Sequence, residues 1–330
     1  MITQIAETTL QQLHSARKHI TFVANKTEHP MNEIIELDSV KVFNDLHGLP
    51  TLHPLFTVVD LKKATQIPAQ ARMHYGLYAL FVKHGVGCTI RYGRQKYDYQ
   101  EGTVTSFAPG QVIEVVNDNG TIHDVTGFLF HPDLIYGTPL AEKIHQYSFF
   151  AYDQKEALHL SDQEQSMLAN CLANMEMEMR NPVDRHSRTL LCVHIELFLD
   201  YCLRFYDRQF YTRAKVNNDV VQQFEREVNL YLRDGASIAT TGLPTVKYFA
   251  DKACLSPSYF GDLIKKETGK TAQEYIRLKL IDKSKQYLRG TSQTVSQIAD
   301  TLGFQYPQHF IRMFKKQTGM TPAEYRVAES

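Results

Sequence analysis

A repeat near the carboxyl end constrains this chain more than any other feature of its sequence. Val246 returns as Val295, a shift of 49 residues, and Phe260 returns as Phe310, a shift of 50. A run of Lys-Lys-x-Thr-Gly follows in both copies. Because the shift grows from 49 to 50 residues, one copy carries a single extra residue in the turn between its helices. Self-similarity of this kind predicts one small supersecondary unit built twice.

Each copy carries the signals of a helix, a tight turn and a second helix. In the first copy Ser256 and Pro257 supply the cap and the first-turn proline of the second helix. In the second copy Gly303 ends the first helix, because glycine adopts the left-handed turn without steric cost. Capping boxes of the form Thr-x-x-Glu or Thr-x-x-Gln precede three of the predicted helices, at residues 271–274, 294–297 and 321–324.

Two helices joined by a short turn are the helix-turn-helix geometry, whose second helix enters the major groove of DNA. An ordinary helical hairpin is the alternative for a single copy. The connecting helix predicted from Gln273 to Leu288 is roughly 24 Å long at ~1.5 Å per residue, which suits two recognition helices about one duplex turn apart. Residues 246–330 also hold 14 Lys and Arg against 8 Asp and Glu in a chain with 36 of each, so positive charge gathers at this end.

The double motif resembles the C-terminal DNA-binding domain of the AraC/XylS family of bacterial transcription regulators. The resemblance covers residues 220–326 and implies two helix-turn-helix units that bind two consecutive major grooves of double-stranded DNA. It further implies a homodimer, a small-molecule effector and contact with RNA polymerase. The residues that carry it most specifically are Ile298-Ala299, Gly303-Phe304, Phe310, Arg312, Phe314-Lys315-Lys316, Gly319, Thr321-Pro322 and Tyr325-Arg326.

The helical period predicts which side chains of each second helix face DNA. If Phe260, Leu263 and Ile264 face the core, the opposite side of that helix carries the readers. The family resemblance implies base contact at three such positions in each copy, namely Ser258, Gly261 and Asp262, and Gln308, Ile311 and Arg312. The full set of candidate DNA-binding residues is Ser258, Gly261, Asp262, Lys265, Pro307, Gln308, Ile311, Arg312 and Lys315.

The two sets differ in chemistry. Gln308 can make a bidentate contact to adenine, and Arg312 can bind guanine or a phosphate. Gly261 reaches no base, and Asp262 is repelled by phosphates although it can accept a hydrogen bond from the cytosine amino group. The second copy is therefore predicted to be the stronger reader. The Lys-Lys pair of each copy fits either phosphate contact or a solvated helix end.

Residues 1–155 are predicted to form a β-rich domain. Short stretches rich in β-branched and aromatic residues, separated by glycine or by Pro109-Gly110, indicate a small barrel or sandwich. The run from Tyr99 to Gln111 resembles a strand and turn of the cupin-like sensor domain of the same family. The predicted strands are Leu55–Leu61, Gly76–Val82, Cys88–Tyr92, Thr103–Ala108, Val112–Val116 and Val125–Phe130.

A cupin-type metalloenzyme with a helical appendage is the rival hypothesis for this region. Such a metal site needs two histidines one residue apart on a strand, with a carboxylate and a third histidine further on. No close pair of this kind occurs, and no nucleophile elbow, phosphate loop or zinc spacing is present. We therefore predict no catalytic residues, no metal and no cofactor. The histidines of this region stand singly, at His47, His53, His74, His84, His123 and His131.

Residues 156–215 are predicted to form a helical linker. Ser161 and Glu164 form a capping box, and a second helix from Arg185 to Tyr211 carries a wide apolar surface. A helical pair at this place commonly mediates dimerisation in the family that the chain resembles. The alternative is that both helices pack only on the barrel and on each other.

Residues 216–330 complete the predicted organisation as an all-α domain with the double helix-turn-helix. One helix within Val216–Ala239, ended by Asp234-Gly235, leads into it. The domain joint is expected near Arg213–Asp219. The fold class is multidomain α+β, with a β-rich cupin-like barrel, a helical dimerisation pair and an all-α C-terminal domain. A third hypothesis treats the repeat as a helical scaffold of a protein-interaction module, which predicts no salt-dependent affinity for DNA.

The remaining sequence features predict a cytoplasmic protein. The chain has five cysteines, an odd number without close pairing, which indicates reduced thiols. No segment is long and apolar enough to span a membrane, and the amino terminus lacks the apolar core of a signal peptide. Residues 2–16 are predicted to form a short amphipathic helix.

Overall fold

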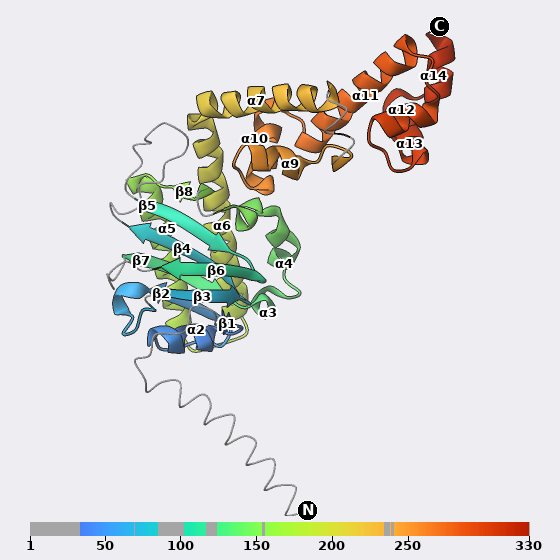
Figure 1. Ribbon diagram of the computed structural model, residues 1–330. Coiled ribbons are helices and arrows are strands. Elements are labelled where there is room, and N and C mark those ends of the chain that lie inside the picture. Colours follow the sequence, from blue (N-terminus) through green and yellow to red (C-terminus); the bar gives the residue numbers. More distant parts are fainter. Residues whose placement is uncertain are drawn as a thin grey trace, which may run out of the picture.

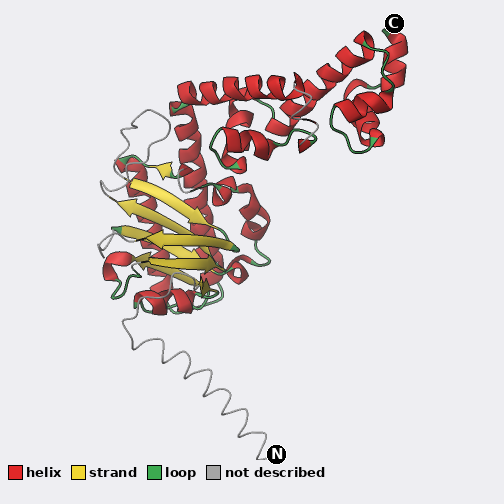
Figure 2. Ribbon diagram, viewed as in Figure 1, coloured by secondary structure: helices red, strands yellow, loops and turns green. Residues whose placement is uncertain are grey.

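The computed structural model describes residues 34–68, 70–84, 102–116, 124–153, 156–233, 238 and 241–329. A β-rich region is followed by helices that extend to the carboxyl end (Figures 1 and 2). The helix predicted over residues 2–16 and the strand predicted over residues 88–92 lie outside the described residues. The strands are β1 (Ile34–Leu37), β2 (Phe56–Asp60), β3 (Gln70–Tyr75), β4 (Tyr78–His84), β5 (Gly102–Phe107), β6 (Gln111–Val116), β7 (Val125–Phe130) and β8 (Leu158–His159).

Fifteen helical segments accompany these strands within the described residues. In the β-rich region they are α2 (Val40–His47), η1 (Leu61–Lys63), α3 (Pro132–Ile135), α4 (Pro139–Lys143), η3 (Ile144–Gln146) and η4 (Ser148–Ala151). Beyond it they are α5 (Asp162–Arg180), α6 (Ser187–Thr212), α7 (Ala214–Arg233), α9 (Val246–Lys252), α10 (Pro257–Thr268), α11 (Ala272–Gly290), α12 (Val295–Thr301), α13 (Pro307–Thr318) and α14 (Pro322–Ala328).

The strands form two sheets, one ordered β1-β3-β6 and the other β2-β7-β4-β5-β8. Strands β1 and β3 run parallel, and the other pairs are antiparallel. Alternate side chains of a strand point to opposite faces, so the five-stranded sheet contributes to two cores. Ala79 and Phe81 of β4 join a cluster that connects the two sheets with α2. Leu80 and Val82 face the other way and belong to the core that contains α5 and α6.

The sequence predicted the coarse architecture, and the structure confirms a mixed α+β protein with a β-rich N-terminal region and a helical C-terminal region. Five of the predicted strands are present as β2, β4, β5, β6 and β7, with β7 matching at both ends and the ends of the others shifted by at most two residues. Strands β1, β3 and β8 were not predicted. In β3 the outward-facing Arg72 and His74 alternate with the buried Ala71, Met73 and Tyr75, and the strand has neither a β-branched residue nor a flanking glycine turn at its start.

Helices α5 and α6 cover the outer face of the five-stranded sheet. The predicted capping box starts α5, since the Ser161 hydroxyl accepts from the Glu164 N–H and the Glu164 carboxylate accepts from the Ser161 N–H. Phe128 of β7 meets Phe198 of α6 edge to face at 5.0 Å between ring centroids. The core that these helices share with the sheet continues without interruption into α7, α10 and α13.

Helix α6 ends at Thr212 and α7 begins at Ala214, within one residue of the predicted joint at Arg213–Asp219. Helix α7 is described from Ala214 to Arg233, which agrees with the predicted end at Asp234-Gly235. We refer below to residues 34–212 as the N-terminal region. Within the described ranges, no helix has the length and apolar character needed to cross a bilayer.

Candidate nucleic-acid interface

Two helix-turn-helix units stand at opposite ends of one connecting helix. The first unit is α9 with α10, the second is α12 with α13, and α11 joins them over 19 residues, about 28 Å at ~1.5 Å per residue. The predicted capping box at Thr271 and Glu274 starts α11, which extends one residue earlier and two later than predicted. The second unit lies at the end of α11 remote from the sheets (Figure 1).

The turns of the two units share a left-handed residue. In the second unit Gly303 has φ +85°, and a Cβ there would lie 2.9 Å from the carbonyl carbon of Gly242. Both the left-handed backbone and the lack of space for a side chain therefore require glycine at this position. The equivalent residue of the first unit is Cys254, which is exposed and has φ +56°. A non-glycine residue in this conformation carries strain of about 1–2 kcal/mol.

The second unit is held rigidly on α11 and α14. Phe310 and Phe314 of α13 are fully buried, and Phe314 meets Tyr325 of α14 with 5.4 Å between ring centroids. The guanidinium of Arg326 donates to the carbonyl oxygen of Leu288 at 3.1 Å and to that of Gln293 at 2.6 Å. These bonds occupy carbonyls at the end of α11 and in the loop after it, so α14 fixes where α13 stands.

The predicted readers of the second unit lie on the open side of α13. Gln308, Arg312 and Lys315 are exposed, while Pro307 and Ile311 are half-buried at the edge of the core. Among the described residues, none forms a hydrogen bond or an ion pair with Gln308 or Arg312. The side chains that the sequence nominated for base contact are therefore available to a ligand on this face.

Sequence reasoning missed two side chains at the amino end of α13. Tyr306 is 53% exposed although it is the N-cap residue, and its side chain makes no capping bond. His309 is exposed and meets the Tyr306 ring at 5.6 Å between centroids. Both lie within two residues of Gln308 in the sequence. An aromatic ring there can contact a thymine methyl group, and an imidazole can bond a phosphate or base. His309 directly follows Gln308 and Tyr306 directly precedes Pro307, so the sequence already placed both beside predicted readers.

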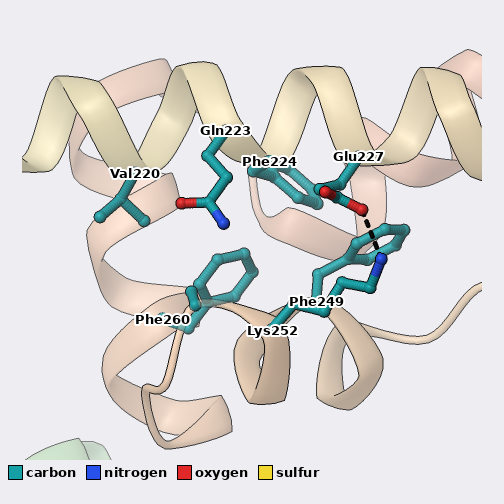
Figure 3. A pocket seen from close by; sticks show the side chains of 8 residues that line it. Val220, Gln223, Phe224, Glu227, Phe249, Lys252 and Phe260 are labelled. Atoms are coloured by element: carbon teal, nitrogen blue, oxygen red, sulfur yellow. Dashed lines mark hydrogen bonds and ion pairs between the residues drawn. The ribbon is translucent and has the colours of Figure 1, made fainter.

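The first unit is built on α7. Phe224 of α7 lies between Phe249 of α9 and Phe260 of α10, at 5.3 and 5.2 Å between ring centroids. The Lys252 ammonium pairs with the Glu227 carboxylate at 2.6 Å at the edge of this contact. Figure 3 shows the shallow pocket that remains, which is lined by Val220, Gln223, Phe224, Glu227, Phe249, Lys252, Ala253 and Phe260.

The predicted readers of the first unit are less open than those of the second. Lys265 is exposed, whereas Ser258, Gly261 and Asp262 are all half-buried. The Oδ2 atom of Asp262 accepts a hydrogen bond from the hydroxyl of Tyr152 at 2.6 Å. A side chain predicted to contact DNA thus accepts a hydrogen bond from a residue of the N-terminal region, just after η4.

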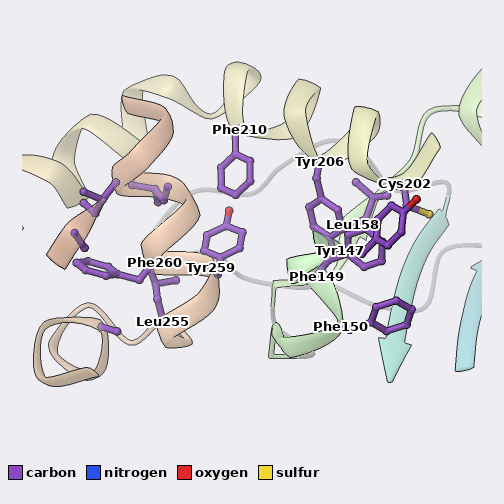
Figure 4. Close-up of a cluster of buried hydrophobic side chains, with 14 of the residues drawn as sticks. Tyr147, Phe149, Phe150, Leu158, Cys202, Tyr206, Phe210, Leu255, Tyr259 and Phe260 are labelled. Atoms are coloured by element: carbon purple, nitrogen blue, oxygen red, sulfur yellow. The ribbon is translucent and has the colours of Figure 1, made fainter. Parts of the chain in front are cut away.

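An aromatic cluster joins the N-terminal region to α10. Tyr259 of α10 is fully buried, and its ring lies 4.9 Å from that of Phe210 and 5.1 Å from that of Tyr152. The Tyr152 ring in turn meets Tyr206 of α6 edge to face at 5.2 Å. The apolar side chains of η4, α6 and α10 belong to one buried cluster. Figure 4 shows its two sides, with Phe149 and Tyr206 on one and Phe210 and Tyr259 on the other. We call this contact, with the polar bonds around it, the docking contact.

The buried carboxylate of Glu156 binds the amino end of α10. Its Oε1 atom accepts from the backbone N–H of Ser256 at 2.6 Å, and its Oε2 atom accepts from the Ser256 hydroxyl. A third bond comes from the backbone N–H of Asp153 at 2.8 Å. Burial raises the pKa of Glu156, and these hydrogen bonds oppose part of that rise. Glu156 thus binds the N-terminus of α10 from the side of the N-terminal region.

The Lys-Lys pairs also differ between the units. Lys266 of α10 forms an ion pair with Asp207 of α6 and lies over the Phe210 ring at 5.2 Å. Its counterpart Lys316 is exposed, as are Lys265 and Lys315. Three of the four ammonium groups therefore remain available for phosphate, and one belongs to the docking contact.

The histidines considered for a metal site are dispersed. His74 pairs with Glu36 across β1 and β3, while His84 bonds Gln165 and Thr126. Burial lowers the pKa of His47, whose Nδ1 lies 2.9 Å from the Phe43 carbonyl oxygen. His123 lies outside the described residues. Over the ranges that the structure describes, no group of three or more His, Cys, Asp or Glu side chains is placed to hold a metal ion.

This arrangement is that of a tandem helix-turn-helix protein. A family model for a helix-turn-helix domain matches residues 249–328. The Tn10 TetD protein of Escherichia coli is 35% identical over 126 residues, which cover 38% of this chain and 80% of that protein. The HTH-type regulator YobQ of Bacillus subtilis is 37% identical over 82 residues, or 25% of this chain and 34% of YobQ.

The arabinose operon regulatory protein of Escherichia coli is 29% identical over 101 residues, which cover 31% of this chain and 34% of that protein. The chain belongs to the AraC family of transcriptional regulators. It matches about a third of the length of YobQ and of the arabinose regulator. The family membership therefore rests on the helix-turn-helix end of the chain.

Proposed function

We propose that this protein is a sequence-specific DNA-binding regulator of transcription whose two units occupy consecutive major grooves of double-stranded DNA. The observation that carries the proposal is the outer face of α13, where Gln308 and Arg312 are exposed on a helix anchored by Phe310 and Phe314. A rigid helix with an amide and a guanidinium on its open face matches the bidentate readout of adenine and guanine in the major groove. Acting on the bacterial chromosome, such a regulator would reside in the cytoplasm.

We further propose the division into a cupin-like sensor domain (residues 1–155), a helical linker (156–215) and a DNA-binding domain (216–330). In the N-terminal region two sheets pack around a filled core, which supports a compact domain there. The sensor domain would bind a small-molecule effector and change how the DNA-binding domain is presented. RNA polymerase would be the partner through which bound protein alters transcription.

Dimerisation through α6 belongs to the same proposal. Leu190, Val193 and Leu197 are 43%, 55% and 42% exposed, and their spacing of three and four residues places them on one side of α6. Exposed leucine and valine side chains at this spacing suit helix-to-helix packing between two copies. Two copies would present four helix-turn-helix units to an operator with repeated half-sites.

Substitution of the proposed readers tests the DNA-binding function. A duplex is first selected from a random library with the wild-type protein, and affinities for it are then measured for Gln308→Ala and Arg312→Ala. Each true base contact should cost about 1–3 kcal/mol and relax discrimination at one base position. Gln317→Ala is the matched control, because Gln317 is an exposed polar residue of the same helix outside the predicted reader set. Unchanged discrimination in both reader variants would refute the assignment.

Salt dependence separates this function from that of a protein-interaction module. Lys and Arg side chains that neutralise phosphates release counterions, so the logarithm of affinity should fall linearly with the logarithm of salt concentration. A helical scaffold for protein binding predicts no such slope. The measurement uses the wild-type protein and the selected duplex at several salt concentrations.

A further inference from the structure

Within the described residues, the polar bonds that the N-terminal region makes to the helix-turn-helix units go to the first unit. Tyr152 donates to Asp262 at 2.6 Å, and Glu156 accepts from the Ser256 backbone at 2.6 Å. Lys266 adds an ion pair with Asp207. All three bonds join α10, the recognition helix of the first unit, to residues more than 50 positions earlier in the chain.

The centre of the docking contact has the character of a core, because its aromatic rings and the Glu156 carboxylate are removed from water. Glu156 and Tyr259 are fully buried, and Phe210 and Tyr206 are only 3% and 5% exposed. A buried carboxylate is tolerated only where hydrogen bonds replace its lost hydration. Two of the three bonds to Glu156 come from Ser256 of the first unit. Separation of α10 would return this carboxylate to water, so docked and separated arrangements are two distinct states.

The docked state is incompatible with groove entry by α10. The major groove is about 12 Å wide, and a helix with its side chains is about 10–12 Å across, so one helix fills it. Helix η4 and the Tyr152 ring lie against the amino-terminal half of α10, the half that contacts bases in a recognition helix. The Oδ2 atom of Asp262 accepts from Tyr152 in this state, and the Tyr152 residue stands where a base would have to approach that oxygen.

We propose that the docking contact is autoinhibitory: the N-terminal region holds the first unit away from DNA, and the second unit alone reads DNA until α10 is released. This inference rests on the proposed DNA-binding function and adds its regulation. Release makes the second groove accessible, so the protein passes from contact with one duplex turn to contact with two. A signal received by the N-terminal region acts by weakening the bonds of Tyr152 and Glu156.

The test removes polar bonds from the N-terminal side without altering α10. The variant Tyr152→Phe/Asp207→Asn deletes the hydroxyl that bonds Asp262 and the charge that pairs with Lys266. Tyr147→Phe is the matched control, since the Tyr147 hydroxyl donates to Asp200 at 2.7 Å entirely within the N-terminal region. Hydroxyl-radical footprints and affinities are measured on the duplex selected with wild-type protein, extended at both ends by random sequence.

Wild type and Tyr147→Phe should each protect about 10 base pairs per protomer, one turn of the duplex. The double variant should protect about 20 base pairs per protomer and bind about tenfold more tightly, because its binding-competent state is more populated. A two-turn footprint for wild type, or equal footprints for the double variant and Tyr147→Phe, would overturn the inference. Loss of all footprints with every variant would instead refute the DNA-binding function on which it rests.

A single variant, Tyr152→Phe, covers the case in which the double variant does not fold. It keeps the aromatic ring and its contacts with Tyr259 and Tyr206, so the core remains filled. The footprint should lengthen for this variant too, with a smaller gain in affinity. A folded Tyr152→Phe protein with the wild-type footprint and affinity counts against the inference.

Discussion

The two helix-turn-helix units share one backbone plan but present different surfaces to the rest of the molecule. Residues 50 positions apart are equivalent in α10 and α13, and the pairs Tyr259 and His309, and Asp262 and Arg312, show the contrast best. Tyr259 is buried in the docking contact and His309 is exposed; Asp262 bonds Tyr152 and Arg312 faces solvent. The duplicated fold thus carries one helix suited to an internal partner and one suited to nucleic acid. What separates them is side-chain choice at a few outward positions.

The largest predicted difference between the units concerns stability at one equivalent position. Tyr259→Ala should lower the free energy of unfolding by about 3–5 kcal/mol, because it empties a fully buried aromatic site. His309→Ala should change it by less than about 0.5 kcal/mol, since the side chain is exposed. Urea unfolding followed by circular dichroism measures both. Equal losses would mean that the two positions have the same environment, contrary to the comparison.

A second prediction concerns the left-handed residue of each turn. Gly303→Ala should destabilise the second unit by at least about 1–2 kcal/mol, because φ is positive and the new methyl group would meet Gly242. Cys254→Gly should do the reverse and stabilise the first unit by a few tenths to about 1 kcal/mol. Thermal unfolding of the two variants gives the comparison. Stabilisation by Gly303→Ala would contradict the turn geometry.

The smallest predicted difference is in the response to pH. Burial raises the pKa of Glu156 above its ordinary 4.5, so its contribution to stability is full below about pH 4.5 and is lost as pH rises through the raised value. The capping carboxylates Glu274 and Glu324 have lowered pKa values, because the N–H groups of Thr271 and Thr321 donate to them. Their contribution is present above about pH 4.5 and is lost as pH falls through the lowered values.

The docking contact of the first unit and the capping boxes next to both units therefore respond to acid in opposite directions. From neutral pH down to about 4.5 the wild-type protein should gain stability relative to Glu156→Gln, which cannot bind the proton. Below that range Glu274→Gln and Glu324→Gln should lose less stability than wild type. Urea midpoints measured across this pH range test both statements. If the urea midpoints of wild type and Glu156→Gln changed with pH in parallel, the pKa of Glu156 would be the same in the folded and unfolded states.

The β-rich region shows where sequence reasoning fell short. Strands β4 and β7 were predicted because runs such as Val125–Phe130 are apolar and β-branched. Strand β3 was missed, since its six residues include no β-branched side chain and no glycine turn marks its start. Helices α2, α3 and α4 were also missed, because each spans no more than eight residues and gives few turns of periodicity.

By itself the sequence determined the duplicated helical units, their caps and the side chains on their open faces. These depend on signals within four residues of each other, such as the boxes at Thr271 and Thr321, whose bonding groups are close together in the chain wherever the segment lies. Only the tertiary structure decided which open face meets another part of the chain. Tyr152 and Asp262 are 110 residues apart, and no periodicity links them. Their bond exists because α6 and η4 bring the N-terminal region against α10 and leave α13 clear of it.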